Sequence, residues 1–246
     1  MRRYAELTLN KIIAPRTKVG GVQYPGGPLE ILVNNTKWDG MRTDAAGNMT
    51  PIPGFTPDGI ANYLSETPDE GTTEIWEFVN LTMDAHPIHL HLVQFQLMNR
   101  QNFDMKAYTA TYNLAFPGGV YIPEYGPPTA YGPSTLSGGK YGGNPDIAPF
   151  LMGAALPPSP NEAGWKDTIM VPPGMVTRIA VRWAPQDPAV ITPASDLFFN
   201  FVPNTNGYDY VWHCHIIDHE DNEMMRPDQV ISNPNASRNY FMGINY

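Results

Sequence analysis

The segment YVWHCHI, residues 210–216, has the aromatic and β-branched composition of a β-strand, and six further segments of the chain share that composition. They are ILVNN (31–35), TEIWEFVNL (73–81), HLVQFQLMN (91–99), DTIMVP (167–172), TRIAVRW (177–183) and LFFNFV (197–202). Turn residues separate them, and no long helical periodicity appears. The sequence therefore predicts an all-β fold, a β-sandwich, with one short helical turn near Asp218–Glu223.

All six histidines lie in two short motifs, and the single cysteine lies in the second motif. HPIHLH begins at residue 86, and HCHIIDHEDNEMM begins at residue 213. Histidines used for packing or surface titration would be scattered, so this grouping indicates a common purpose. A lone buried cysteine is usually an inert hydrophobic residue. Imidazole, thiolate and thioether together, however, are the ligands of a copper electron-transfer site.

The alternation of side chains along a strand divides the second motif between two faces. If YVWHCHI is a strand, His213 and His215 project to one face and Cys214 projects to the other. His219 and Met224 follow Cys214 by five and ten residues, which allows the chain to turn back toward the thiol. The second motif therefore predicts one ligand group built around the cysteine and another built from its two neighbours.

The side chains of the first motif are also divided between two faces of a strand. His89 and His91 share a face, and His86 falls on the opposite face provided that Pro87 does not break the register. Two adjacent strands with these patterns would build two metal sites. The predicted sites contain His89, His91, His213 and His215 on one face, and His86, Cys214, His219 and Met224 on the other.

The two motifs resemble the C-terminal copper-binding segments of the three-domain multicopper oxidases, the family of laccases and bilirubin oxidases. The likeness is greatest to the bacterial spore-coat laccases. GTTEIWEFVN (71–80), HPIHLHLVQFQ (86–96), GWKDTI (164–169) and HCHIIDHEDNEMMRP (213–227) carry it. The resemblance implies a cupredoxin-like Greek-key β-sandwich. At 246 residues, the length fits a single such domain over residues 1–246 with a long insertion.

The resemblance also implies a role for each ligand. His86, Cys214 and His219 match the equatorial ligands of a type 1 copper, Met224 matches its axial ligand, His89 matches a type 2 ligand, and His91, His213 and His215 match ligands of the paired type 3 coppers. In this family, electrons enter at the type 1 copper and dioxygen is reduced to water at the trinuclear cluster. Glu220 matches a glutamate implied in proton delivery. Asp84, beside the first motif, is a candidate for orienting an imidazole.

The chain offers only part of that cluster. A trinuclear cluster in these enzymes takes eight histidines, of which four have counterparts here, and residues 1–85 and 95–212 contain none. We therefore expect the C-terminal part of a laccase-like oxidase on its own polypeptide. Its type 2 and type 3 coppers would be shared with a second chain that carries the N-terminal cupredoxin domains. Dispersed methionines favour small phenols or aromatic amines over cuprous ions as the reductant, with dioxygen as acceptor.

Two other classes of function stay open on the sequence alone. One is a copper electron-transfer or nitrite-reductase-like cupredoxin subunit. A simple blue-copper carrier would not need His89, His91, His213 and His215, and copper nitrite reductases, which share metal sites between subunits, have ligand strings that differ from HPIHLH and HCHIIDHEDNEMM. The other is a structural, coat-associated protein with a vestigial copper site, against which the intact ligand set counts. Copper content and oxygen uptake, measured for the chain alone and with its partner, would separate the three.

Charge and hydropathy exclude several partners. The chain has 15 basic and 24 acidic residues, a net charge of −9, and no basic run suited to nucleic acid. No stretch of about 18 apolar residues suggests a membrane span. The first residues lack the apolar core of a secretory signal, and the compartment stays open.

The segment from Tyr108 to Pro160 differs in composition from the rest of the chain. It contains PGG, YGPP, SGGKYGG and PPSP together with several tyrosines, and Gly and Pro this dense predict an absence of regular structure. Such a long loop is either functional or disordered. We expect this insertion to be a lid or an interface with the missing domains, or else a solvated surface excursion.

Overall fold

The computed structural model describes residues 2–9, 13–14, 16–24, 27–28, 31–33, 41–43, 49–51, 66–114, 145–185, 198–204, 210–222, 224–236 and 238. The strands are β1 (Arg2–Leu9), β2 (Ile13–Ala14), β3 (Thr17–Val19), β4 (Val22–Tyr24), β5 (Gly27–Pro28), β6 (Ile31–Val33), β7 (Met41–Thr43), β8 (Met49–Pro51), β9 (Thr73–Asn80), β10 (His86–Leu90), β11 (Phe95–Phe103), β12 (Leu151–Leu156), β13 (Trp165–Lys166), β14 (Thr168–Val171), β15 (Met175–Arg182), β16 (Tyr210–Cys214) and β17 (Met225–Asp228). The helices are α1 (Met105–Leu114), the 3-10 helix η3 (Ala148–Phe150) and α3 (Ile217–Glu220).

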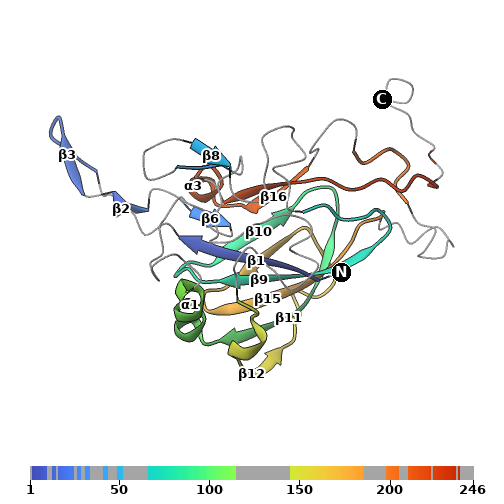
Figure 1. Ribbon diagram of the computed structural model, residues 1–246, viewed down its shortest axis with the longest axis horizontal. Coiled ribbons are helices and arrows are strands. Elements are labelled where there is room, and N and C mark those ends of the chain that lie inside the picture. Colours follow the sequence, from blue (N-terminus) through green and yellow to red (C-terminus); the bar gives the residue numbers. More distant parts are fainter. Residues whose placement is uncertain are drawn as a thin grey trace.

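Two sheets form the body of the molecule. The larger sheet has the order β12-β11-β15-β9-β1-β6, with β13 also paired to β11, and the smaller sheet has the order β14-β10-β16-β17. β1 runs parallel to β9, whereas the strands of the smaller sheet are antiparallel. In Figure 1, β2 and β3 extend away from these sheets. The arrangement confirms the predicted all-β, cupredoxin-like sandwich.

The main hydrophobic core lies between the two sheets. The smaller sheet contributes Ile88, Leu90, Ile169, Val171, Trp212 and Cys214, and the larger sheet contributes Trp76, Phe78, Phe95, Leu97, Ile179 and Val181. Trp212 contacts Trp76 edge-on at a ring-centroid distance of 5.5 Å. A fully buried large apolar side chain contributes roughly 1.5–3 kcal/mol, so this layer fixes how the two sheets face each other. Cys214 belongs to this core, and the position of its sulfur is therefore set by packing.

A second, smaller hydrophobic cluster joins α1 and η3 to the larger sheet, where it includes Val79, Phe103 and Val176. Tyr108 of α1 is fully buried against Phe103 and Phe150, at ring-centroid distances of 5.7 and 5.3 Å. In Figure 1, α1 lies beside the β11–β12 side of the sheet. None of the described helices is long and apolar enough to cross a membrane.

The prediction that Tyr108–Pro160 lacks regular structure is wrong at both ends of that segment. Residues up to 114 form α1, and η3 and β12 cover residues 148–156. For α1 the physical reason is local composition, because Met105–Leu114 contains neither Gly nor Pro, which are concentrated between residues 117 and 145. Residues 115–144 lie outside the described residues, and the expectations of a lid, an interface or a solvated excursion stay untested.

Every expected strand segment except LFFNFV contains a strand. In the described residues 198–202, the backbone groups of Phe199 are bound by side chains instead of by a neighbouring strand. Its N–H donates to the Glu70 carboxylate at 2.9 Å, and its carbonyl accepts from Arg238 at 2.6 Å. HLVQFQLMN is strand only from Phe95 onward, because residues 91–94 connect the smaller sheet to the larger one.

Candidate metal centre

The two histidine motifs lie on neighbouring antiparallel strands, β10 and β16. Ile88 pairs with Cys214, and His89 lies directly opposite His213. Along β10 the residues alternate between buried and half-buried, starting with the fully buried His86. Pro87 therefore does not break the register. The predicted division of the ligands between two faces of one sheet is present.

The face toward the core holds the first group, which we call the thiol cluster: His86, Cys214 and His219. The Cys214 Sγ lies 3.5 Å from Nδ1 of His86 and 3.6 Å from Nδ1 of His219, and the two Nδ1 atoms are 3.1 Å apart. His219 reaches the cluster from α3, the helical turn predicted near residue 218, which directly follows the end of β16 (Figure 1). All three ligand atoms lie within 4.8 Å of one another.

Met224, the fourth residue predicted for this group, is fully buried beside it. The N–H of Cys214 donates to the Met224 carbonyl at 3.0 Å, and the N–H of Met224 donates to the His219 carbonyl at 3.0 Å. These bonds return the chain to the thiol after α3, and they fix the backbone of all three residues. The Met224 side chain packs in the same core as Cys214.

Burial keeps the thiol cluster uncharged in the absence of a cation. It lowers the pKa of His86 to about 4, helped by the neighbouring His219 and opposed by the charge of Asp84, and it also lowers the pKa of His219. Burial raises the pKa of the Cys214 thiol to about 11. Two neutral imidazoles keep lone pairs available, and a cation would be needed to stabilise the thiolate.

The opposite face holds the second group, which we call the histidine cluster: His89, His91, His213 and His215. One ligand atom from each of His89, His91 and His213 lies within 4.8 Å of the others. The ring of His215 joins them at centroid distances of 5.6 Å from His89 and 5.3 Å from His213. His91 and His215 are exposed and His213 is buried, so the group lies at the surface with one member anchored inside.

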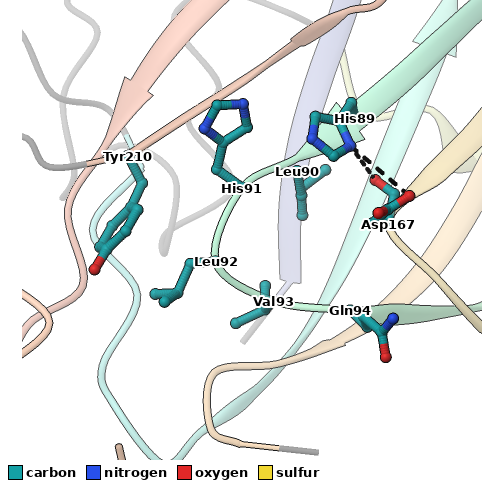
Figure 2. A pocket seen from close by; sticks show the side chains of 8 residues that line it. All are labelled: His89, Leu90, His91, Leu92, Val93, Gln94, Asp167 and Tyr210. Carbon is teal, nitrogen blue, oxygen red and sulfur yellow. Dashed lines mark hydrogen bonds and ion pairs between the residues drawn. The ribbon is translucent and has the colours of Figure 1, made fainter. Parts of the chain in front are cut away.

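A pocket of about 420 Å³ opens at the histidine cluster. Its lining includes His89, His91, Asp167 and Tyr210, and Figure 2 shows His89 turned toward Asp167, with Tyr210 on the other side of the pocket. Burial lowers the pKa of His91, with His89 and His213 acting in the same direction. A neutral imidazole at an open pocket can bind a metal ion without first losing a proton.

Glu220 lies at the edge of the histidine cluster. Its Oε2 is 3.3 Å from Nδ1 of His213, which is also 3.1 Å from the carbonyl oxygen of Cys214. Burial lowers the pKa of His213, whereas the Glu220 carboxylate and the Cys214 carbonyl act in the opposite direction. The residue predicted for proton delivery is therefore within reach of one of the predicted ligands.

Sequence reasoning missed the groups that hold the histidine rings. Asp84, the expected partner, is exposed, and within the described part of the chain its carboxylate makes no hydrogen bond to a histidine. Its charge only partly opposes the burial that lowers the pKa of both His86 and His219. The ring of His86 instead contacts the Thr82 hydroxyl, with Nε2 2.6 Å from Oγ1. The ring of His89 contacts Thr168, with Nδ1 2.9 Å from Oγ1. The only sign of such a partner in the sequence is Thr82, a hydroxyl residue four positions before His86.

The donor sets of both clusters fit copper. Imidazole nitrogen, thiolate and thioether are soft or intermediate ligands that suit copper, and a group of histidines alone suits copper as well. The donor atoms of the thiol cluster, and those of His89, His91 and His213 in the histidine cluster, lie within 4.8 Å of one another, which is a spacing suited to ligands around one ion or a compact group of ions. Burial lowers the pKa of His86, His91, His213 and His219, which favours the neutral imidazole that can bind a metal ion.

The sequence of this chain is similar to those of known multicopper oxidases. A family model described as "Multicopper oxidase" matches residues 35–233. The chain is 31% identical over 210 residues to a protein named "Laccase" from Bacillus subtilis (strain 168), covering 85% of this chain and 26% of that protein. It is 36% identical over 168 residues to "Multicopper oxidase LPR1" from Arabidopsis thaliana, covering 68% of this chain and 24% of that protein.

Among solved structures, the McoA multicopper oxidase from the hyperthermophile Aquifex aeolicus aligns with 93% of this chain and 29% of its own length, at 19% identity and a TM-score of 0.42. The chain thus spans about a quarter of the length of the curated relatives that it matches.

Proposed function

The chain belongs to the multicopper oxidase family, and we propose that it is the C-terminal copper-binding part of a laccase-like oxidase. In this proposal the complete enzyme oxidises small phenols or aromatic amines one electron at a time and reduces dioxygen to water. One observation carries the proposal. Adjacent strands β10 and β16 present a thiol cluster on one face and a histidine cluster on the other, linked by the consecutive residues His213, Cys214 and His215.

We assign His86, Cys214, His219 and Met224 to a type 1 copper, and His89, His91, His213 and His215 to the type 2 and type 3 coppers. Copper would supply one-electron redox chemistry at the first site and oxygen-binding capacity at the second. The protein's part is to hold the donor atoms. Core packing fixes the Cys214 sulfur between the two imidazoles of the thiol cluster, and it excludes water from that side.

Glu220 is the residue to which we assign proton transfer. Reduction of dioxygen to water consumes protons, and a positioned carboxylate can deliver them. The side chain of Glu220 is 30% exposed, so it can exchange protons with solvent while its Oε2 stays 3.3 Å from His213. The position of the Glu220 carboxylate between solvent and His213 is the feature that supports this role.

The remaining ligands would come from a second polypeptide with N-terminal cupredoxin domains. Two features support this proposal. The chain contains four histidines outside the thiol cluster, half of the set used by the family, and two of these four are exposed beside an open pocket. Ligands from another protein surface could reach these exposed imidazoles and complete the coordination of a shared metal ion.

The test is a measurement of copper content and oxygen uptake for the chain alone and after addition of the second polypeptide. We expect the single chain to bind copper at the thiol cluster without sustained oxygen uptake, and the complex to take up oxygen with a phenolic reductant. Oxygen reduction to water by the single chain would contradict the shared cluster. Copper binding without oxygen uptake by the complex would favour an electron-transfer subunit, and failure to bind copper would favour a structural protein.

A further inference from the structure

Two of the proposed ligands, His86 and His89, each have one ring nitrogen facing a cluster and the other bound by a threonine. A neutral imidazole has one protonated nitrogen and one nitrogen with a free lone pair. Only the second can bind a metal ion, so the position of that proton decides which nitrogen can act as a ligand. The contacts of Thr82 determine this position for His86, and those of Thr168 together with the Asp167 carbonyl determine it for His89.

The assignment for His86 begins with Asn80, whose side chain is fully buried. Its Nδ2 lies 2.8 Å from the carbonyl of Asp84 and 2.9 Å from the carbonyl of Val171. Carbonyl oxygens only accept, so this atom must be the amide nitrogen. Its Oδ1 accepts from the N–H of Thr82 at 2.9 Å. Three contacts therefore fix the orientation of the amide.

The Asn80 Oδ1 in turn determines the direction in which the Thr82 hydroxyl donates its proton. Thr82 Oγ1 lies 2.8 Å from Asn80 Oδ1, and two oxygens this close attract only if a proton lies between them. The amide oxygen has no proton to give, so the hydroxyl donates. The hydroxyl then offers only a lone pair to Nε2 of His86, 2.6 Å away. Nε2 must carry the proton, and Nδ1, 3.5 Å from the Cys214 sulfur, is left with the lone pair.

His89 has the opposite arrangement. Its Nδ1 lies 2.9 Å from the Asp167 carbonyl and 2.9 Å from Thr168 Oγ1. The carbonyl can only accept, and the Thr168 hydroxyl donates to Asp167 Oδ1 at 3.0 Å. Nδ1 of His89 therefore carries the proton, and Nε2 keeps the lone pair. Figure 2 shows this ring held from the Asp167 side of the pocket.

We propose that Thr82, held by Asn80, and Thr168 are positioning residues that impose opposite tautomers on two histidines of the same strand. His86 is thereby prepared to bind through Nδ1 in the thiol cluster, and His89 through Nε2 in the histidine cluster. The use of these nitrogens for copper rests on the proposed function, but the tautomers do not. Groups that orient a ligand histidine in this way typically change metal affinity by about 10- to 100-fold when they are lost.

The test is ¹⁵N NMR of the histidine rings in the full, metal-free chain at a pH where imidazole is neutral. Long-range couplings assign the proton to Nδ1 or Nε2 for each ring. We expect Nε2–H for His86 and Nδ1–H for His89 in the wild type. Thr82→Val should populate the other tautomer of His86 and weaken copper binding at the thiol cluster by about 10- to 100-fold in a chelator competition. Thr82→Ser, which keeps the hydroxyl, should restore both properties.

Thr168→Val is the matched variant. It should leave the tautomer of His86 unchanged, and it should reduce the preference of His89 for Nδ1–H without abolishing it, because the Asp167 carbonyl remains. A wild-type spectrum with the proton on Nδ1 of His86 or on Nε2 of His89 would overturn the proposal without any variant. An unchanged His86 tautomer in a folded Thr82→Val chain would overturn it too. Because the tautomers are measured without metal, a chain that shows them but binds no copper would refute only the proposed function.

Discussion

At the scale of single residues, the decisive feature is that neighbours in sequence belong to different clusters. Cys214 points into the core, whereas His213 and His215 belong to the histidine cluster on the other face. This follows from the period of two along a strand and needs no special backbone geometry. It places the buried Cys214 thiol one residue from two histidines of the other face, of which His215 is exposed and His213 is buried.

The Cys214→Ser substitution tests the role of the thiol. In the copper-loaded chain we expect loss of the intense blue charge-transfer band, because the copper–thiolate bond is the chromophore of a type 1 site. Visible absorption spectroscopy at matched copper content measures this. Met98→Ala, at an exposed residue on β11, is a control that should keep the band. A blue colour that survives in the serine variant would show that the thiol is not a copper ligand.

The Glu220→Gln substitution tests proton transfer separately from electron entry. The amide keeps the size of the side chain but cannot shuttle a proton, so oxygen reduction by the complex should fall by roughly 100-fold or more. The blue band should persist, because Glu220 is not part of the thiol cluster. Asp221→Asn, at the exposed end of α3, is the matched control. Equal oxygen-uptake rates for the two variants would remove Glu220 from the mechanism.

At the scale of elements, the sequence predicted the parts of the site that depend on strand parity. The opposite faces of His86 and His89, and the helical turn that brings back His219, could be read from spacing alone. The pairing of β10 with β16 was an assumption that the structure supports. The hydroxyl partners could not be predicted in the same way, because Thr168 comes from a third strand, β14, whose pairing with β10 leaves no local pattern.

Two errors at the element scale, at LFFNFV and at β1, have a common physical origin. LFFNFV has strand composition, but its described part is bound by Glu70 and Arg238 side chains and not by a strand. β1 was not anticipated, and it pairs in parallel with β9 over a separation of more than 70 residues. Composition reports what a segment can form, whereas long-range contacts decide what it does form.

The buried carboxylate of Glu70 connects three segments that are far apart in the sequence, and its effect on stability can be tested. It accepts from the N–H groups of Phe199 and Asn233 and pairs with the Arg238 guanidinium. Burial alone would raise the pKa of this carboxyl, but the hydrogen bonds and the charge of Arg238 hold its pKa below the usual value. The stabilisation is therefore present at pH values above about 4.5 and is lost as the pH falls through the lowered pKa.

We expect Glu70→Gln to reduce the free energy of unfolding at neutral pH by about 3 kcal/mol, because it leaves the Arg238 charge without its counter-ion. The difference from wild type should shrink as the pH falls through the lowered pKa of the wild-type Glu70 carboxyl, because that carboxylate then becomes protonated. Urea unfolding across this pH range measures both effects. Asp69→Asn, at the adjacent exposed residue, should change stability by less than about 0.5 kcal/mol. A difference that is constant with pH would contradict the role given to the carboxylate.

At the scale of the whole molecule, the two clusters differ in how complete they are. The thiol cluster is closed by the core and by the return of the chain to Met224. The histidine cluster opens into a pocket of about 420 Å³ and exposes His91 and His215. A second protein surface could supply further ligands to the histidine cluster. If both chains bind the same metal ions, the free energy of metal binding stabilises the complex between them.

We therefore expect a tight complex with a second chain that carries further cupredoxin domains, with an interface above about 2,000 Å² in total centred on the histidine cluster. Removing copper with a chelator should weaken this complex as well as its activity, and adding copper back should restore both. His91→Ala should weaken the complex. Cys214→Ser, which alters only the thiol cluster, should leave it assembled. Size-exclusion chromatography with light scattering on the natively purified protein measures the mass of the active species. An active species with the mass of this chain alone, or of several copies of it, would contradict the expected complex.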